Sequence, residues 1–169
     1  MLRTTSLLLL LAAAARADDP AKKDTYPQDQ QGTVDRLEKI KSLRQAANNP
    51  RNAAVLREAL DRLREEVKDF RTYLSKRLTG DGLKDWSGTV KAVTAENVSF
   101  EVGPGLILRV SRAGMDGPTR GVIKTLSTDD PVMINVSPVL LADVIGDPGN
   151  LVAVVGGKYL TVQHGKPKP

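Results

Sequence analysis

The stretch from residue 56 to residue 74 constrains this chain more than any other. Six apolar side chains recur there at alternating spacings of four and three, and most residues between them are charged. On an α-helix this spacing gathers the apolar side chains into a single seam. The members of the seam are Leu56, Leu60, Leu63, Val67, Phe70 and Leu74. Such a seam must be buried, so this helix needs a partner.

Two helices are expected in the helical segment at 33–79. Asn49 suits an N-cap and Pro50 the first position of a helix, while proline disfavours helical geometry in the residue before it. A first helix is therefore predicted over 33–47 and a second over 50–78. Either the two form a hairpin docked on the rest of the chain, or the seam joins two chains as a short coiled coil in a homo-oligomer.

The start of the chain has the features of a secretory signal over 1–17. A basic residue is followed by an apolar run and by a small-x-small cleavage site at 15–17. The apolar run is shorter than the roughly 20 residues that span a bilayer. We therefore predict cleavage and export to the periplasm or the extracellular space, with no transmembrane segment in the mature chain. The polar residues 18–32 lack an apolar period, which predicts a flexible tether.

The second half of the chain, at 86–163, changes to the alternating pattern of β-strands. Apolar and polar residues alternate, with turns between them, over 89–93, 98–102, 106–110, 120–126, 132–136, 151–155 and 158–163. Gly156 and Gly157 predict a tight hairpin between the last two of these strands. Ser137 and Pro138 resemble a helix start, so one short buried helix is predicted over 137–146.

Together these patterns predict an α+β protein. Its N-terminal helical hairpin or short coiled-coil segment should be followed by a small antiparallel β-barrel, for which oligonucleotide/oligosaccharide-binding (OB-like) and SH3-like barrels are the nearest architectures. Trp86, where the helices meet the strands, is expected in the core. The tail at 164–169 is expected to be disordered.

The amino-acid composition limits which ligands and reactions the chain could support. The chain has 25 basic and 20 acidic residues, and removing the signal with its two arginines leaves 23 against 20, a net charge of +3. That weak excess, with few aromatic residues, argues against a nucleic-acid partner. There is no cysteine, so neither a disulfide nor a thiolate metal site can form. The single histidine, His164, lies near the C-terminus and makes a poor general base. We therefore expect no enzyme activity, no metal and no cofactor.

A set of basic residues on or beside the predicted strands is the candidate ligand-binding site. Their forked or ammonium donors could bind an anionic polymer on a shared outer face. The set consists of Lys91, Arg109, Arg112, Arg120 and Lys124.

The sequence therefore predicts a non-enzymatic exported protein of the cell envelope or the extracellular space. Its helical segment would serve packing or self-association, and its barrel would bind an envelope protein or polymer. The alternative is a solute- or carbohydrate-binding module that uses the barrel face and the loop at 111–119.

Overall fold

A computed structural model describes residues 26–49 and 52–165 of the chain. Its elements follow in the order α1 (Gln28–Asn48), α2 (Ala53–Gly80), β1 (Leu83–Val93), β2 (Asn97–Gly103), β3 (Leu106–Ser111), α3 (Gly117–Thr125), β4 (Pro131–Val136), β5 (Asp143–Asp147), β6 (Asn150–Val155), the 3-10 turn η1 (Gly157–Tyr159) and β7 (Leu160–His164). The α+β class expected from the sequence is confirmed. The predicted signal at 1–17 and the first part of the predicted tether lie outside the described residues.

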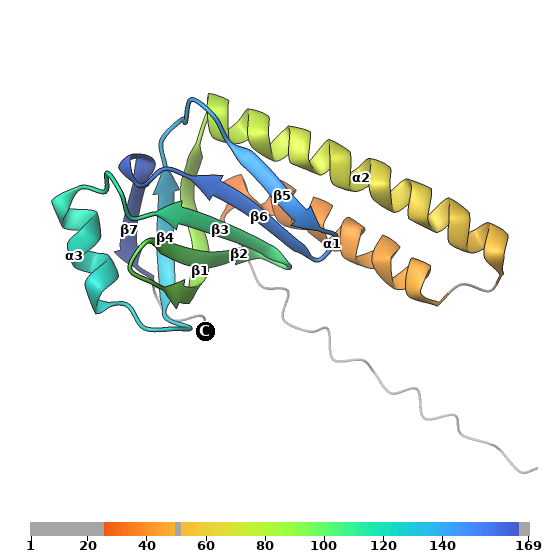
Figure 1. The fold of residues 1–169 in the computed structure, drawn as a ribbon, viewed down its shortest axis with the longest axis horizontal. Coiled ribbons are helices and arrows are strands. Elements are labelled where there is room, and N and C mark those ends of the chain that lie inside the picture. Colours follow the sequence, from red (N-terminus) through yellow and green to blue (C-terminus); the bar gives the residue numbers. More distant parts are fainter. Residues whose placement is uncertain (1–25, 50–51, 166–169) are drawn as a thin grey trace, which may run out of the picture.

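The helices α1 and α2 form an antiparallel hairpin that extends away from the sheet (Figure 1). The N-cap of α2 is Asn52, whose side chain accepts a hydrogen bond of 2.9 Å from the Val55 amide. Across the hairpin, the hydroxyls of Thr33 and Tyr73 lie 3.4 Å apart. α1 begins at Gln28, five residues before the predicted start at 33, so the last part of the predicted tether is helical.

Most of the seam is buried within one chain. Leu63, Val67, Phe70 and Leu74 are all buried, and Phe70 is fully enclosed. The longer α1 reaches the level of Tyr73 and beyond, so the end of α2 has cover that a helix starting at 33 could not give. Towards the tip of the hairpin, Leu56 and Leu60 are only half-buried.

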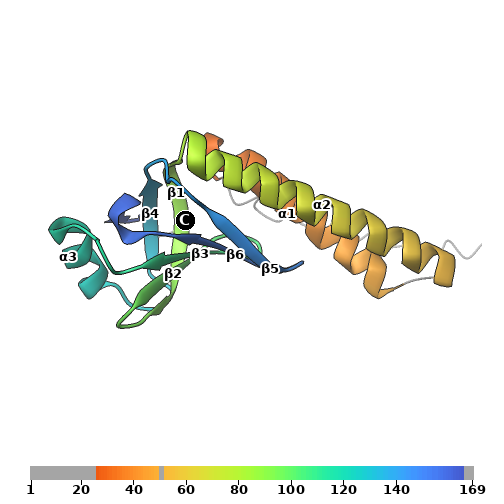
Figure 2. The same ribbon diagram turned by 45° about the horizontal axis from the view of Figure 1, so that its top comes forward.

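The sheet has seven strands in the order β5-β6-β3-β2-β1-β4-β7. β1, β2 and β3 form the antiparallel meander that the sequence predicts. β6 then pairs with β3 in parallel, which makes the sheet mixed. The early part of β1 pairs with β4 and its later part with β2, with register shifts in both ladders. These irregularities let one long strand serve both halves of the curved sheet in Figure 2.

The predicted antiparallel barrel is wrong, because the sheet is not closed and includes a parallel pair. The cause lies at Gly156 and Gly157, where the expected hairpin does not form. The 3-10 turn η1 instead carries the chain from β6, beside β3, to β7, beside β4. Gly157 is buried there, and a Cβ on it would lie 2.2 Å from the Ser111 carbonyl oxygen. Neither an OB-like nor an SH3-like identity follows from this topology.

Two further predicted elements are wrong. Residues 120–126 were expected as a strand but belong largely to α3, whose N-cap Asp116 accepts a 2.7 Å hydrogen bond from the Thr119 amide. The helix predicted over 137–146 is an extended segment followed by β5, which pairs with β6. There the Val139 amide donates to the Leu78 carbonyl, so tertiary hydrogen bonds replace those of a helix.

The core lies between the concave side of the sheet and the end of the hairpin. Its largest fully enclosed side chains are Trp86, Phe70 and Phe100, so the expected burial of Trp86 is confirmed. His164, expected in a disordered tail, is the last residue of β7.

The first turn of α1 is fixed to the sheet by polar side chains. The Asp29 carboxylate accepts a 2.8 Å hydrogen bond from the Trp86 indole and a longer one from the Lys84 amide. It also forms an ion pair with Arg77. Burial alone would raise the pKa of Asp29, but the hydrogen bonds from Arg77, Trp86 and Lys84, with the charge of Arg77, outweigh it and lower that pKa below its ordinary 3.8.

Replacing Phe70 with alanine should destabilise the fold by about 3–5 kcal/mol, since a fully buried ring is exchanged for a cavity. The matched control is Leu56→Ala on the same seam, which should cost less, about 1–2 kcal/mol, because Leu56 is only partly buried. Urea denaturation followed by circular dichroism measures both. Equal losses would show that the two ends of the seam are buried alike, contrary to this packing.

Asp29→Asn should destabilise the protein at neutral pH, where the ionised carboxylate holds Arg77. A carboxyl group with a lowered pKa stabilises the fold above its unfolded value, here about 3.8, and loses that contribution as the pH falls through the folded value. The difference in unfolding free energy between wild type and variant should therefore shrink as the pH is lowered below about 4. Asp61→Asn, in an exposed pair on α2, is the control and should show little effect.

Candidate functional site

Lys91 and Arg109, two of the residues predicted to bind a ligand, lie on the outer, convex face of the sheet. Lys91 forms ion pairs with Glu101 at 2.9 Å and with Asp129 at 3.5 Å. The hydrogen bond and charge of Glu101 raise the pKa of Lys91 above its usual value. Arg109 is exposed on β3, opposite Ser99 of β2. The charge of Lys91 is thus already compensated within the chain.

Arg112 and Arg120 line one shallow cavity of about 650 Å³ at the end of the β1–β2 hairpin, together with Glu96. Each arginine also donates to a backbone carbonyl: Arg112 to Thr94 at 2.6 Å, and Arg120 to Met115 at 3.1 Å. Backbone carbonyls therefore occupy part of the donor capacity of both arginines.

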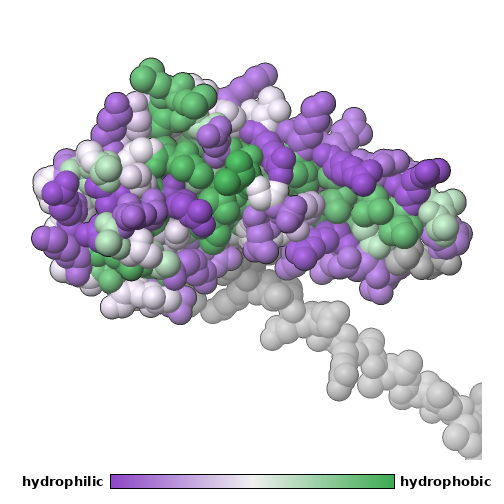
Figure 3. Space-filling model, viewed as in Figure 1, coloured by the Kyte–Doolittle hydropathy of each residue, from purple (hydrophilic) through white to green (hydrophobic). Residues whose placement is uncertain are grey.

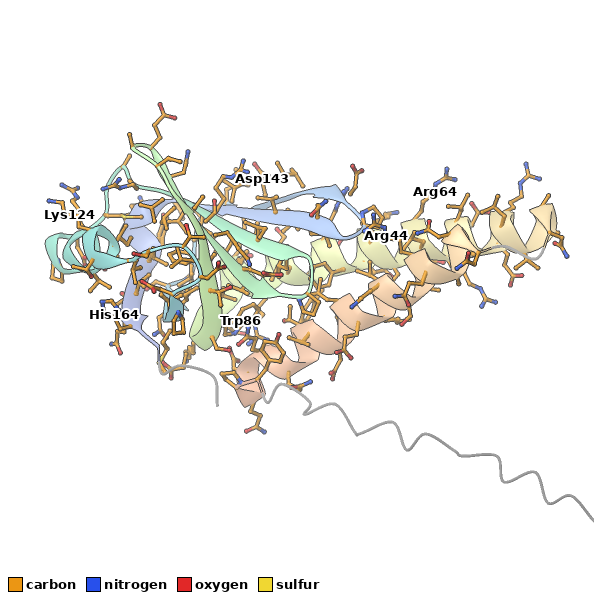
Figure 4. All side chains as sticks on the ribbon, turned by 90° about the horizontal axis from the view of Figure 1, so that it is seen from below. Arg44, Arg64, Trp86, Lys124, Asp143 and His164 are labelled. Carbon is orange, nitrogen blue, oxygen red and sulfur yellow. The ribbon has the colours of Figure 1, made fainter. Side chains whose placement is uncertain are left out.

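Lys124 lies on α3, at the end of the molecule away from the hairpin (Figure 4). The five basic residues therefore do not share one face. Only Arg112 and Arg120 line a common cavity, and the loop predicted at 111–119 is shortened by the start of α3.

A second feature is apolar and was missed from the sequence. Leu140 and Leu141 are 89% and 76% exposed, and Ile145 on β5 is 52% exposed. The register aligns Ile145 with Val152 of β6, and Val152 with Ile107 of β3. We call this the outer apolar surface: Leu140, Leu141, Ile145, Val152, Val154 and Ile107. Figure 3 shows apolar side chains gathered over β5, β6 and the segment before β5.

A third feature is a cleft of about 340 Å³ between α1 and the turns that follow β2 and β5. We call it the α1 cleft. Leu37, Ile40 and Leu151 lie beneath it but are 2% exposed or less, while Lys41 and Arg44 contribute exposed cationic side chains. Glu101 also lines it, but its carboxylate is paired with Lys91.

These two features could not be found by pattern reading. The run Val139-Leu140-Leu141 looks like part of a buried helix, because the Ser-Pro before it resembles a helix start. The α1 cleft unites residues from α1 with two turns far along the chain. Its one signal in the sequence is the presence of glycine in both turns, at Gly105 and Gly149, each with a positive φ.

Metal-ligating side chains do not gather into a metal centre within residues 26–49 and 52–165. No group of three or more histidine, aspartate or glutamate side chains is placed there to hold a metal ion. The Nε2 atom of His164 lies 3.1 Å from the Thr125 hydroxyl, at the exposed end of β7. Across the same residues, none of the helices has the length and apolar character needed to cross a bilayer.

No protein-family model, curated protein or solved structure matches this chain.

Proposed function

We propose that this chain is an exported, non-enzymatic binding protein whose sheet presents a docking surface to another protein of the cell envelope or the extracellular space. Export is supported by the signal pattern at 1–17. The observation that carries the binding role is the exposure of Leu140 and Leu141, two adjacent large apolar side chains on one segment. Exposed apolar patches of this kind mark interaction sites in many soluble proteins.

A protein partner fits the exposed side chains of the sheet better than an anionic polymer does. The polymer would need basic side chains along one face, whereas the basic residues here are dispersed and Lys91 is already paired. The outer apolar surface instead offers branched aliphatic side chains on a regular sheet, bordered by Arg109 and Asp143. An apolar centre with a polar rim is typical of protein–protein interfaces.

Self-association through the seam is the less favoured role of the hairpin. Four of its six residues are already buried in one chain, which leaves Leu56 and Leu60 as the available part. A second candidate function, solute binding, would use the α1 cleft, whose lining includes the cationic side chains of Lys41 and Arg44.

The mature chain from residue 18 should have the mass of a monomer in solution, because most of the seam is already buried within one chain. Light scattering over a concentration series measures this. A dimer that persists on dilution, and that Leu56→Asp with Leu60→Asp dissociates, would show instead that the hairpin tip is an assembly device.

A photocrosslinking residue, p-benzoylphenylalanine, placed at position 141 should give one adduct of defined mass in the cells that produce the protein. The same group at the exposed Gln163 of β7 is the matched control and should give none. Unlabelled protein should compete with the adduct, whereas a Leu140→Ser, Leu141→Ser competitor should not. The double variant should change the unfolding free energy by about 0.5 kcal/mol or less, since both leucines are exposed.

Adducts that form equally at position 163, or that the serine variant competes away as well as the wild type, would contradict the proposed docking surface.

A further inference from the structure

We infer that the outer apolar surface binds an amphipathic α-helix of the partner protein. The helix lies along β6, with an acidic residue facing Arg109 and a basic residue facing Asp143. This inference rests on the docking role proposed above and names the kind of segment that docks. Three features support it: the backbone pairing of β6, the two charges beside that strand, and the contacts of α2 with the edge of β5.

β6 is the middle strand beneath this surface, and its backbone is paired on both sides, with β3 in parallel and with β5 in antiparallel. Its outward side chains, Val152 and Val154, are partly exposed, and Val152 is flanked by Ile107 and Ile145. Figure 1 shows β5, β6 and β3 in front of the described helices. A segment that covers this aliphatic face must satisfy its own backbone N–H and C=O groups, which an α-helix does internally.

Two opposite charges lie beside β6 in one row across the sheet. Arg109 of β3 is aligned with Val154, and Val154 is aligned with Asp143 of β5. Both charged residues are exposed, and within the described part of the chain neither forms an ion pair. Neighbouring strands lie about 4.8 Å apart, so the Cα atoms of Arg109 and Asp143 are separated by about 10 Å. That separation matches the diameter of about 10–12 Å of a helix with its side chains.

A helix over Val154 therefore has Arg109 at one flank and Asp143 at the other. Charges of opposite sign at the two flanks favour a helix that carries an acid on one side and a base on the other, and they disfavour a helix with two like flanks. The six residues of β6 span about 20 Å, a length that about 13 helical residues cover. Leu141, two residues before Asp143, extends the apolar strip past this row.

Addition of a partner strand at the edge of β5 fits the structure less well than a helix on the face. The Ala142 carbonyl accepts a 3.1 Å hydrogen bond from the Ser75 hydroxyl, and the Gly146 carbonyl accepts one from Arg71. A strand added along this edge would have to displace both contacts with α2. A helix on the outer face leaves them intact.

The test is NMR titration of the mature chain with synthetic peptides of about 14 residues that carry one leucine stripe at helical spacing. The amide signals of Ile107, Val152 and Val154 report binding. A mixed peptide has glutamate along one flank of the stripe and lysine along the other, and two uniform peptides have only glutamate or only lysine. The mixed peptide should bind about threefold more tightly, or better, than either uniform peptide, because it alone matches both charges. Two central prolines should weaken its binding about tenfold or more, since they break the helix.

Charge reversal should change which peptide binds most tightly. Arg109→Glu should make the lysine peptide the tightest, and Asp143→Lys should make the glutamate peptide the tightest. Lys124→Glu, a charge reversal at an exposed position of α3, is the matched control and should leave the order unchanged.

Equal affinities for the three peptides, an order that Arg109→Glu does not change, or full binding of the proline peptide would overturn the inference. Shifts of the same signals with phosphatidylcholine vesicles but not with the mixed peptide would also overturn it, because the surface would then bind a lipid bilayer.

The crosslinking assay at position 141 separates this inference from the docking role. If unlabelled wild type competes with the adduct and the Arg109→Glu protein does not, both are supported. If the two compete equally, the docking role stands and the charge-matched helix is wrong. If no adduct forms in the cells, the docking role itself is wrong.

Discussion

The attachment of the first turn of α1 to strand β1 is the constraint on which the rest of the structure depends. Gln30 is fully buried, and its amide donates to the carbonyls of Ser87 at 2.8 Å and Val102 at 2.6 Å while accepting from the Ser87 amide at 2.9 Å. One side chain therefore joins α1 to two neighbouring strands. A buried amide satisfied on both its donor and acceptor sides fixes orientation, because any shift of the helix would leave polar groups unpaired. With that turn fixed, Leu37 packs over Gly103, where a Cβ would lie 2.8 Å from it, and the α1 cleft forms beyond this contact.

Side chains from helices of the same chain donate hydrogen bonds to backbone carbonyls at both edges of the open sheet. Along β5, the Ser75 hydroxyl of α2 donates to the Ala142 carbonyl at 3.1 Å, and Arg71 donates to the carbonyl of Gly146. Along β7, the Thr119 hydroxyl of α3 donates to the Leu160 carbonyl at 3.3 Å. Unpaired strand edges invite pairing with other chains, and closing a barrel is one way to remove them. Here side chains of α2 and α3 occupy a few of the carbonyls at the two edges of a sheet that stays open.

The local patterns of this chain predicted its two long helices and its meander well, because both depend on neighbours in sequence. The α+β class, the burial of Trp86 and the pairing of β1, β2 and β3 could all be read from spacing. The predictions were wrong where contacts between residues far apart in the sequence determine the local structure. Residues 137–142 have a helical start signal, but their amides find partners at Tyr159 and Leu78 instead. The two glycines at 156 and 157 allow a hairpin, yet each flanking strand finds another neighbour in the sheet.

The same distant contacts fix the backbone that displays the two leucines of the outer apolar surface. Leu140 and Leu141 point to solvent, but the residues on either side of them, Val139 and Ala142, are buried. The Val139 amide donates to Leu78, and the Ala142 carbonyl accepts from Ser75, so both anchors lie on the end of α2. The leucines are thus displayed from a backbone that is already fixed. A partner that covers them would lose little free energy to ordering this segment, which makes exposed leucines here more effective than the same pair on an unanchored loop.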